Sequence, residues 1–155
     1  MIFSIDPGNV QSAYSIINDN LKPIQFGKID NADLLQIIYE YDFKNSYFAI
    51  EMISCYGMAV GATTFETVFW IGRFWEACNC KNKRKIYRKD VKINLCSSMK
   101  AKDANIRQSL IDRFGDVGVK ANQGWFYGFK ADIWSSYAVG ITFYDLYKDE
   151  EKINV

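Results

Sequence analysis

The chain is 155 residues long, carries a net charge of +1 and is 49% hydrophobic, which favours a single domain spanning residues 1–155. Its hydrophobic and aromatic content is enough to build a core, so neither disorder nor a disulfide scaffold is needed to explain stability. The absence of histidine excludes a mixed Cys/His zinc site. No apolar run approaches the ~20 residues of a membrane span and no signal peptide is recognisable, so we expect a cytoplasmic protein without a membrane partner.

Segments rich in β-forming residues predict four strands, at residues 1–6, 10–18, 24–29 and 46–51. The Asp-Pro-Gly-Asn sequence between the first two is typical of a turn and predicts a hairpin. Apolar residues at helical spacing predict a helix over residues 33–41, for which Asn31 is the expected N-cap.

The second half of the chain is predicted to be mainly helical. Residues 62–78 favour a long helix with more apolar surface than one core needs, which indicates a subunit interface. A short strand at Ile86 and Tyr87 is followed by amphipathic helices over residues 104–114 and 131–147. Three antiparallel strands, a helical crossover, a further strand and closing helices predict an α/β fold with a mixed sheet flanked by helices.

The small net charge hides a strongly basic segment between residues 81 and 92, whose only acid is Asp90. We expect this segment to form one positive surface suited to a polyanion. Acids near the C-terminus, among them Glu151, offset its positive charge in the net charge of the chain. A solvated lysine-rich turn is the alternative interpretation. The basic residues of the segment are Lys81, Lys83, Arg84, Lys85, Arg88, Lys89 and Lys92.

Two predicted strands each end in a carboxylate. Side-chain alternation places Asp6 on the same face as Ile2 and Ser4, and Glu51 on the same face as Ala49. A charge at the end of a buried strand is costly unless it is paired or binds a metal, so two acids at matching positions suggest a shared cation. For either acid alone, a place at the solvated rim of the sheet is the simpler interpretation.

A third acid, Asp132, is predicted to lie on the otherwise buried face of the last helix, with Ser135 and Ser136. Alternatively it is an ordinary first-turn acid favoured by the helix dipole. Three convergent acids beside a basic patch are the set expected for metal-dependent phosphodiester cleavage. In that reaction two cations roughly 3.5–4 Å apart activate water and stabilise the leaving oxygen.

Four segments, in this order and at these separations, resemble the RuvC-type Holliday junction resolvases: residues 5–9 (IDPGN), 48–51 (FAIE), 88–92 (RKDVK) and 131–140 (ADIWSSYAVG). The small, histidine-free chain is most similar to a phage-borne member. The resemblance implies an RNase H-like fold, a homodimer and Mg²⁺-dependent paired nicking of four-way DNA junctions and other branched DNA, with Mn²⁺ as a substitute metal. It also implies that Asp6, Glu51 and Asp132 are the catalytic and metal-binding acids.

The chain departs from the family pattern at Ser135, where the family has a second acid on the last helix. A neutral hydroxyl is a weaker Mg²⁺ ligand, so either the site is weakened or a neighbour compensates. Asp103 is the candidate for that role, although its position matches a lysine in bacterial relatives. The resemblance further implies that Lys92 and the catalytic Lys102 orient the scissile phosphate.

The resemblance also implies a DNA-binding surface and a dimer. The helix at residues 62–78 matches the family's dimer helix, and two-fold symmetry suits two symmetric strands. The family's junction-wedging aromatic falls near Ser54, which leaves Tyr56 or Met58 to replace it. Phosphate contacts that weaken with salt are expected from the basic segment 81–92 together with Lys100, Arg107 and Arg113.

Three alternatives stay open at this point. An actin-like ATP-binding domain begins with a similar strand and turn, but it needs a second phosphate loop and a longer chain. A junction-binding protein with little or no cleavage is consistent with Ser135. An RNase H-like nuclease that acts on RNA would differ from a resolvase only in its substrate.

Overall fold

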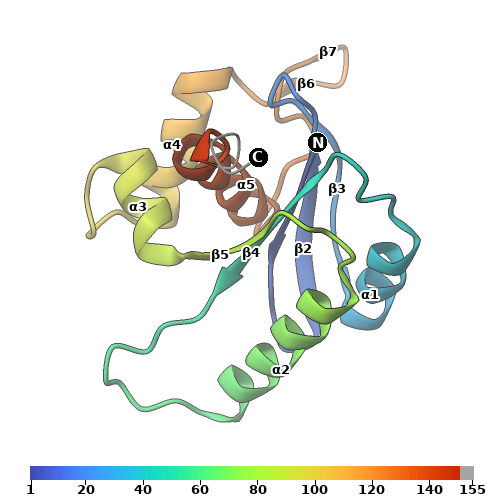
Figure 1. Cartoon of the computed structure of the whole chain (residues 1–155). Coiled ribbons are helices and arrows are strands. Elements are labelled where there is room, and N and C mark those ends of the chain that lie inside the picture. Colours follow the sequence, from blue (N-terminus) through green and yellow to red (C-terminus); the bar gives the residue numbers. More distant parts are fainter. Residues whose placement is uncertain (151–155) are drawn as a thin grey trace.

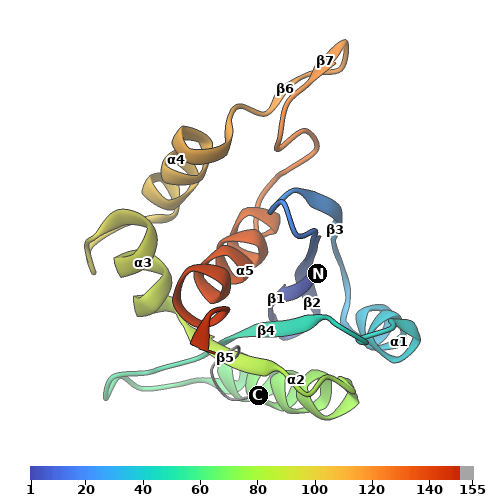
Figure 2. The same ribbon diagram turned by 45° about the horizontal axis from the view of Figure 1, so that its top comes forward.

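The computed structural model describes residues 1–150, and residues 151–155, which include Glu151, lie outside the described part. It contains a five-stranded mixed sheet with helices on both faces, as Figures 1 and 2 show. The sheet strands are β1 (Ile2–Asp6), β2 (Gln11–Ile17), β3 (Pro23–Asp30), β4 (Tyr47–Met52) and β5 (Lys83–Tyr87). The helices are α1 (Asn31–Glu40), α2 (Ala62–Ala77), α3 (Arg88–Cys96), α4 (Asp103–Phe114) and α5 (Ile133–Tyr147). Among the described residues, no helix combines the length and apolar character that crossing a membrane requires.

The strand order of the sheet is β3-β2-β1-β4-β5. β1, β2 and β3 pair in antiparallel fashion, and β4 and β5 then extend the sheet in parallel with β1. The prediction of three antiparallel strands followed by parallel strands is therefore confirmed. A second, two-stranded sheet of β6 (Gly118–Val119) and β7 (Asn122–Gln123) was not predicted.

The two faces of the sheet carry separate hydrophobic cores. α1 and α2 cover the face formed by residues such as Phe3, Ile5 and Phe48. α5 covers the opposite face, and α3 and α4 pack outside it (Figure 1). α5 lies close to the strands because small residues face each other at this contact. The Oγ atoms of Ser15 on β2 and Ser136 on α5 are 2.7 Å apart. The N-terminal end of α5 is thereby fixed over the strand ends.

The turn after β1 is held by a buried side-chain network. Asn31 begins α1 instead of capping it, since its buried amide donates to the Gly8 carbonyl and its Oδ1 accepts from Ser12 Oγ at 2.6 Å. A Cβ at Gly8 would lie 2.2 Å from the Gln11 carbonyl oxygen, so the turn needs glycine there. The network fixes the chain directly after Asp6.

The sequence prediction missed one helix and misplaced the start of another. α3 was missed because Val91 is its only buried residue, which leaves a basic segment without a clear apolar stripe. The last helix begins at Ile133 rather than residue 131, since Ala131 adopts a left-handed φ of 45° and Asp132 is the N-cap. Asp132 therefore lies ahead of the helix and not on its buried face.

Candidate active site

The three predicted acids meet at one edge of the sheet. Asp6 is the last residue of β1, and Glu51 lies in the parallel neighbour β4, one residue beyond the paired Ile5 and Ile50. Asp132 reaches the same edge from the start of α5, and its charge acts on Asp6. The sequence prediction that Asp6 and Glu51 share a face and an edge agrees with this register.

The environment disfavours the charged form of two of these acids. Burial raises the pKa of Asp6 well above its ordinary value, and the charges of Glu51 and Asp132 raise it further. Burial also raises the pKa of Glu51, although the charge of Arg88 opposes this. The Glu51 Oε2 atom is buried, and no group in residues 1–150 hydrogen-bonds to it. The surroundings therefore do not fully balance the negative charge that these carboxyl groups carry when they are ionised.

Two basic side chains lie against the acids. Lys28 of β3 donates to Asp132 Oδ2 at 2.5 Å, and this hydrogen bond raises the pKa of Lys28. Arg88, the first residue of α3, contacts Asp103 and places Nη1 3.8 Å from Glu51 Oε2. The side chain of Asp132 is 48% exposed and that of Glu51 only 16%, so the acids extend from a buried floor to an open rim. The sequence analysis did not identify Lys28.

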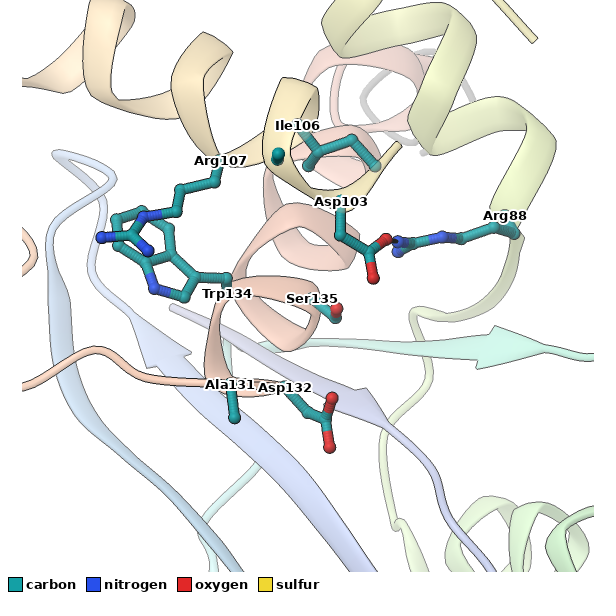
Figure 3. Close-up of a pocket in the computed structure, with 9 residues that line it drawn as sticks. Arg88, Asp103, Ile106, Arg107, Ala131, Asp132, Trp134 and Ser135 are labelled. Carbon is teal, nitrogen blue, oxygen red and sulfur yellow. Dashed lines mark hydrogen bonds and ion pairs between the residues drawn. The ribbon is translucent and has the colours of Figure 1, made fainter. Parts of the chain in front are cut away.

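A cavity of about 350 Å³ lies beside Asp132, between the first turns of α4 and α5. In Figure 3, Asp103 and Asp132 face it from α4 and from the residue before α5, and Ser135 lies on the wall between them. The guanidinium of Arg107 stacks 4.8 Å from the centre of the Trp134 ring. The complete lining is Arg88, Asp103, Ala104, Ile106, Arg107, Ala131, Asp132, Trp134 and Ser135.

The chain matches no protein-family model and no curated protein sequence. The solved structures that it does match include two of RuvC from Thermus thermophilus. One is a complex with a Holliday junction substrate, with a TM-score of 0.65 and 10% identity, and the match covers 92% of each chain. The other has a TM-score of 0.62 and 13% identity over 92% of each chain. The fold is that of RuvC. This agrees with the predicted RNase H-like architecture.

The remaining predicted catalytic residues lie around the acids and differ in their exposure to solvent. Lys92 of α3 is half-buried and its charge acts on Glu51. Lys102 is exposed at the N-cap of α4, where its backbone N–H donates to Asn105 Oδ1. Asp103 is 83% exposed, but its charge still acts on both Asp6 and Glu51. Asp103 therefore belongs to the electrostatic environment of the acids.

The basic segment does not form the single surface that was predicted. In β5 the Lys83 ammonium donates to the Trp75 carbonyl oxygen at the end of α2, on one face of the sheet. The next residue, Arg84, stacks on Tyr147 of α5 on the other face. Strand alternation divides the segment in this way, because successive side chains of β5 point to opposite faces. Lys81, Lys85 and Lys89 are exposed.

The acids fit a divalent cation by their chemistry. Carboxylate oxygens are the ligands that Mg²⁺ and Mn²⁺ prefer. The buried oxygen of Glu51 without a hydrogen bond and the raised pKa of Asp6 are both observations that a bound cation would reverse. In the present side-chain arrangement, no three Cys, Asp or Glu side chains within residues 1–150 lie close enough together to hold a metal ion. Asp132 is turned towards Lys28, so metal binding requires it to change partner.

Proposed function

We propose that this chain is a structure-selective DNA endonuclease that resolves four-way junctions, and other branched DNA, by metal-dependent paired nicking. The observation that carries the proposal is the convergence of Asp6, Glu51 and Asp132 at one sheet edge in a chain with the RuvC fold. A cavity lined by one of these acids, Asp132, supports the proposal, because a DNA strand could approach the site there.

Asp6, Glu51 and Asp132 would hold the divalent cation, Mg²⁺ or Mn²⁺. The bound ion supplies activation of water and neutralises charge on the phosphate. In the reaction the water oxygen forms a bond to phosphorus and the strand's P–O bond breaks, which leaves one phosphate end and one hydroxyl end. Ser135 supplies only a hydroxyl, and Asp103 faces the same cavity with a carboxylate. Asp103 is therefore our candidate for the missing acid.

DNA would be held by phosphate contacts that carry no sequence information. Lys92 and Lys102 are proposed to act closest to the scissile phosphate. Tyr56 and Met58 are exposed in the loop between β4 and α2 and would be the groups that enter the junction. The basic residues proposed to contact phosphates elsewhere are Lys81, Lys83, Arg84, Lys85, Arg88, Lys89, Lys100 and Arg107.

A homodimer completes the proposal. The outer face of α2 exposes Phe65, Val68 and Phe69, which is apolar area that water disfavours. A second copy of the chain packed on this face would place two identical sites about a two-fold axis. Two sites so related suit the two strands cut in a junction. We also keep the expectation of a phage-encoded protein, which rests on chain size and the lack of histidine.

The test is cleavage of an end-labelled mobile four-way junction in Mg²⁺ by this chain and its Ser135→Asp variant, with linear duplex as control. We expect symmetric nicks in the junction and none in the duplex, with a faster reaction for Ser135→Asp because it adds a carboxylate to the cavity. If neither protein cuts or prefers the junction, the proposal is wrong.

The serine at position 135 favours a second candidate function, junction binding with little or no cleavage. A junction-binding protein with little cleavage would retard the junction in a gel, and only Ser135→Asp would cut it. An RNA–DNA hybrid included in the same assay tests the remaining alternative. Cleavage of the hybrid in place of the junction would indicate an RNase H-like nuclease that acts on RNA.

A further inference from the structure

Lys28 lies in the same row of the sheet as Asp6. Ala13 of β2 pairs with Asp6 of β1 on one side and with Lys28 of β3 on the other. Residues directly opposite each other on paired strands project from the same face of a sheet, so all three side chains project towards α5. Lys28 is thus directed by the fold to the face that carries the acids.

Ala13, the middle residue of this row, is buried and has a short side chain. Lys28 donates to Asp132 Oδ2 at 2.5 Å, and the charge of Asp6 also acts on it. The Lys28 side chain remains 40% exposed. Its ammonium group is therefore anchored by the sheet, directed at the acids and still open to a ligand that enters from solvent.

The second basic residue of the site is held more firmly. Arg88 forms ion pairs with both Glu51 and Asp103, through Nη1 and Nη2 respectively, and its side chain is 28% exposed. In the described part of the chain, Lys28 forms its ion pair with Asp132 alone. Lys28 is therefore the cation that becomes available when Asp132 changes partner.

On the basis of the proposed function, we infer that Lys28 binds the scissile phosphate. When Asp132 turns to the metal, the Lys28 ammonium donates to a non-bridging oxygen of that phosphate. A lysine is suited to this change because its ammonium is a compact charge on a flexible stem. A donor aimed at oxygens whose charge grows in the transition state stabilises that state, and removing one such donor costs roughly 10²–10³-fold in rate. Lys28 would then be a catalytic residue contributed by β3.

The test compares Lys28→Met with Lys22→Met in single-turnover cleavage of the junction at saturating protein. Lys22 is exposed in the turn before β3, so its variant makes the same change of charge in the same hairpin away from the acids. We expect Lys28→Met to cut roughly 10²-fold more slowly than Lys22→Met, with similar junction affinity. Lys28→Arg, which keeps the charge, should recover part of the rate. If Lys28→Met melts below the assay temperature, Lys28→Gln replaces it.

A second readout is Mn²⁺ binding without DNA, measured by calorimetric titration. Because Mn²⁺ no longer competes with the ammonium for Asp132, Lys28→Met should bind it about 2- to 5-fold more tightly than Lys22→Met does.

The two measurements separate this inference from the proposed function. Equal cleavage rates for Lys28→Met and Lys22→Met, in a wild-type chain that cuts, overturn the role of Lys28 alone. Unchanged Mn²⁺ affinity overturns the exchange of partners at Asp132. A wild-type chain that cuts no branched DNA in Mg²⁺ or Mn²⁺ overturns the proposed function, and the inference with it.

Discussion

Replacing Gly140 with alanine tests how closely α5 must approach the sheet. Gly140 lies in α5 above β1 and β2. A Cβ built there would be 2.5 Å from Ile17 Cδ1 and 2.8 Å from Ser4 Oγ. Real Cβ atoms do not make such contacts, so the two side chains, α5 or the strands must shift, and Ser4 and Ile17 are fully buried with little room to do so.

The sign of the effect follows from two opposing contributions. Alanine is favoured over glycine inside a helix by about 0.8–1.0 kcal/mol. Overpacking a well-packed core typically costs about 1–3 kcal/mol, and two short contacts place Gly140→Ala in the upper part of that range. We therefore expect the free energy of unfolding to fall by about 1–2 kcal/mol. At about 2–4 °C per kcal/mol, the melting temperature should fall by roughly 2–8 °C.

Gly72 of α2 provides a matched control, because no atom of residues 1–150 lies within 4 Å of a Cβ built there. Gly72→Ala should raise the free energy of unfolding by about 0.5–1 kcal/mol. Urea unfolding at low protein concentration measures both variants without a contribution from association. A Gly140→Ala protein as stable as Gly72→Ala would refute the close packing of α5. Since Asp132 caps this helix, Gly140→Ala should also reduce cleavage more than junction binding.

Two further variants test the acids and the outer face of α2. Asp6→Asn should abolish cleavage, keep junction binding in a gel shift and raise the melting temperature of the metal-free protein near pH 7. Because the native pKa of Asp6 is raised, wild-type stability increases as pH falls through that value, and the advantage of Asp6→Asn should disappear below the unfolded value of about 3.9. Phe69→Asp on α2 should convert a dimer to monomers in sedimentation, whereas Tyr39→Asp, at an equally exposed aromatic of α1, should not. A dimeric Phe69→Asp protein would exclude this face as the interface.

The strands were predictable because β-forming residues and turn residues coincide there. The Asp-Pro-Gly-Asn turn separates β1 from β2 as expected, and the alternation of β4 places Glu51 correctly. α3 was not predictable, since tertiary contacts and not an apolar stripe hold it, with Val91 as its only buried residue. Asn31 was assigned to a cap from its residue type, whereas its amide serves the turn at Gly8.

The acids of the site could be predicted from the sequence, but their counter-ions could not. Asp6 and Glu51 each follow from alternation within one strand. Lys28 depends on the register of β3 against β2, and a slip by one residue would move its side chain to the other face. Its partner Asp132 is 104 positions away, at a helix start whose position depends on the left-handed Ala131.

The arrangement of these counter-ions explains how three acids can converge without excluding a metal. Fully buried ion pairs would hold the carboxylates too firmly, because separating such a pair leaves an uncompensated buried charge. The pair between Lys28 and Asp132 is instead about half exposed, and exposed pairs are worth about 0–1 kcal/mol. A cation that displaces Lys28 therefore loses at most roughly fivefold in affinity. It gains by relieving the repulsion at Asp6 and by contacting the buried Glu51 oxygen, which accepts no hydrogen bond within residues 1–150. The balance favours replacement of Lys28 by the metal cation at Asp132. Without metal, the ion pair with Lys28 holds Asp132 in place, and the cation can replace that contact.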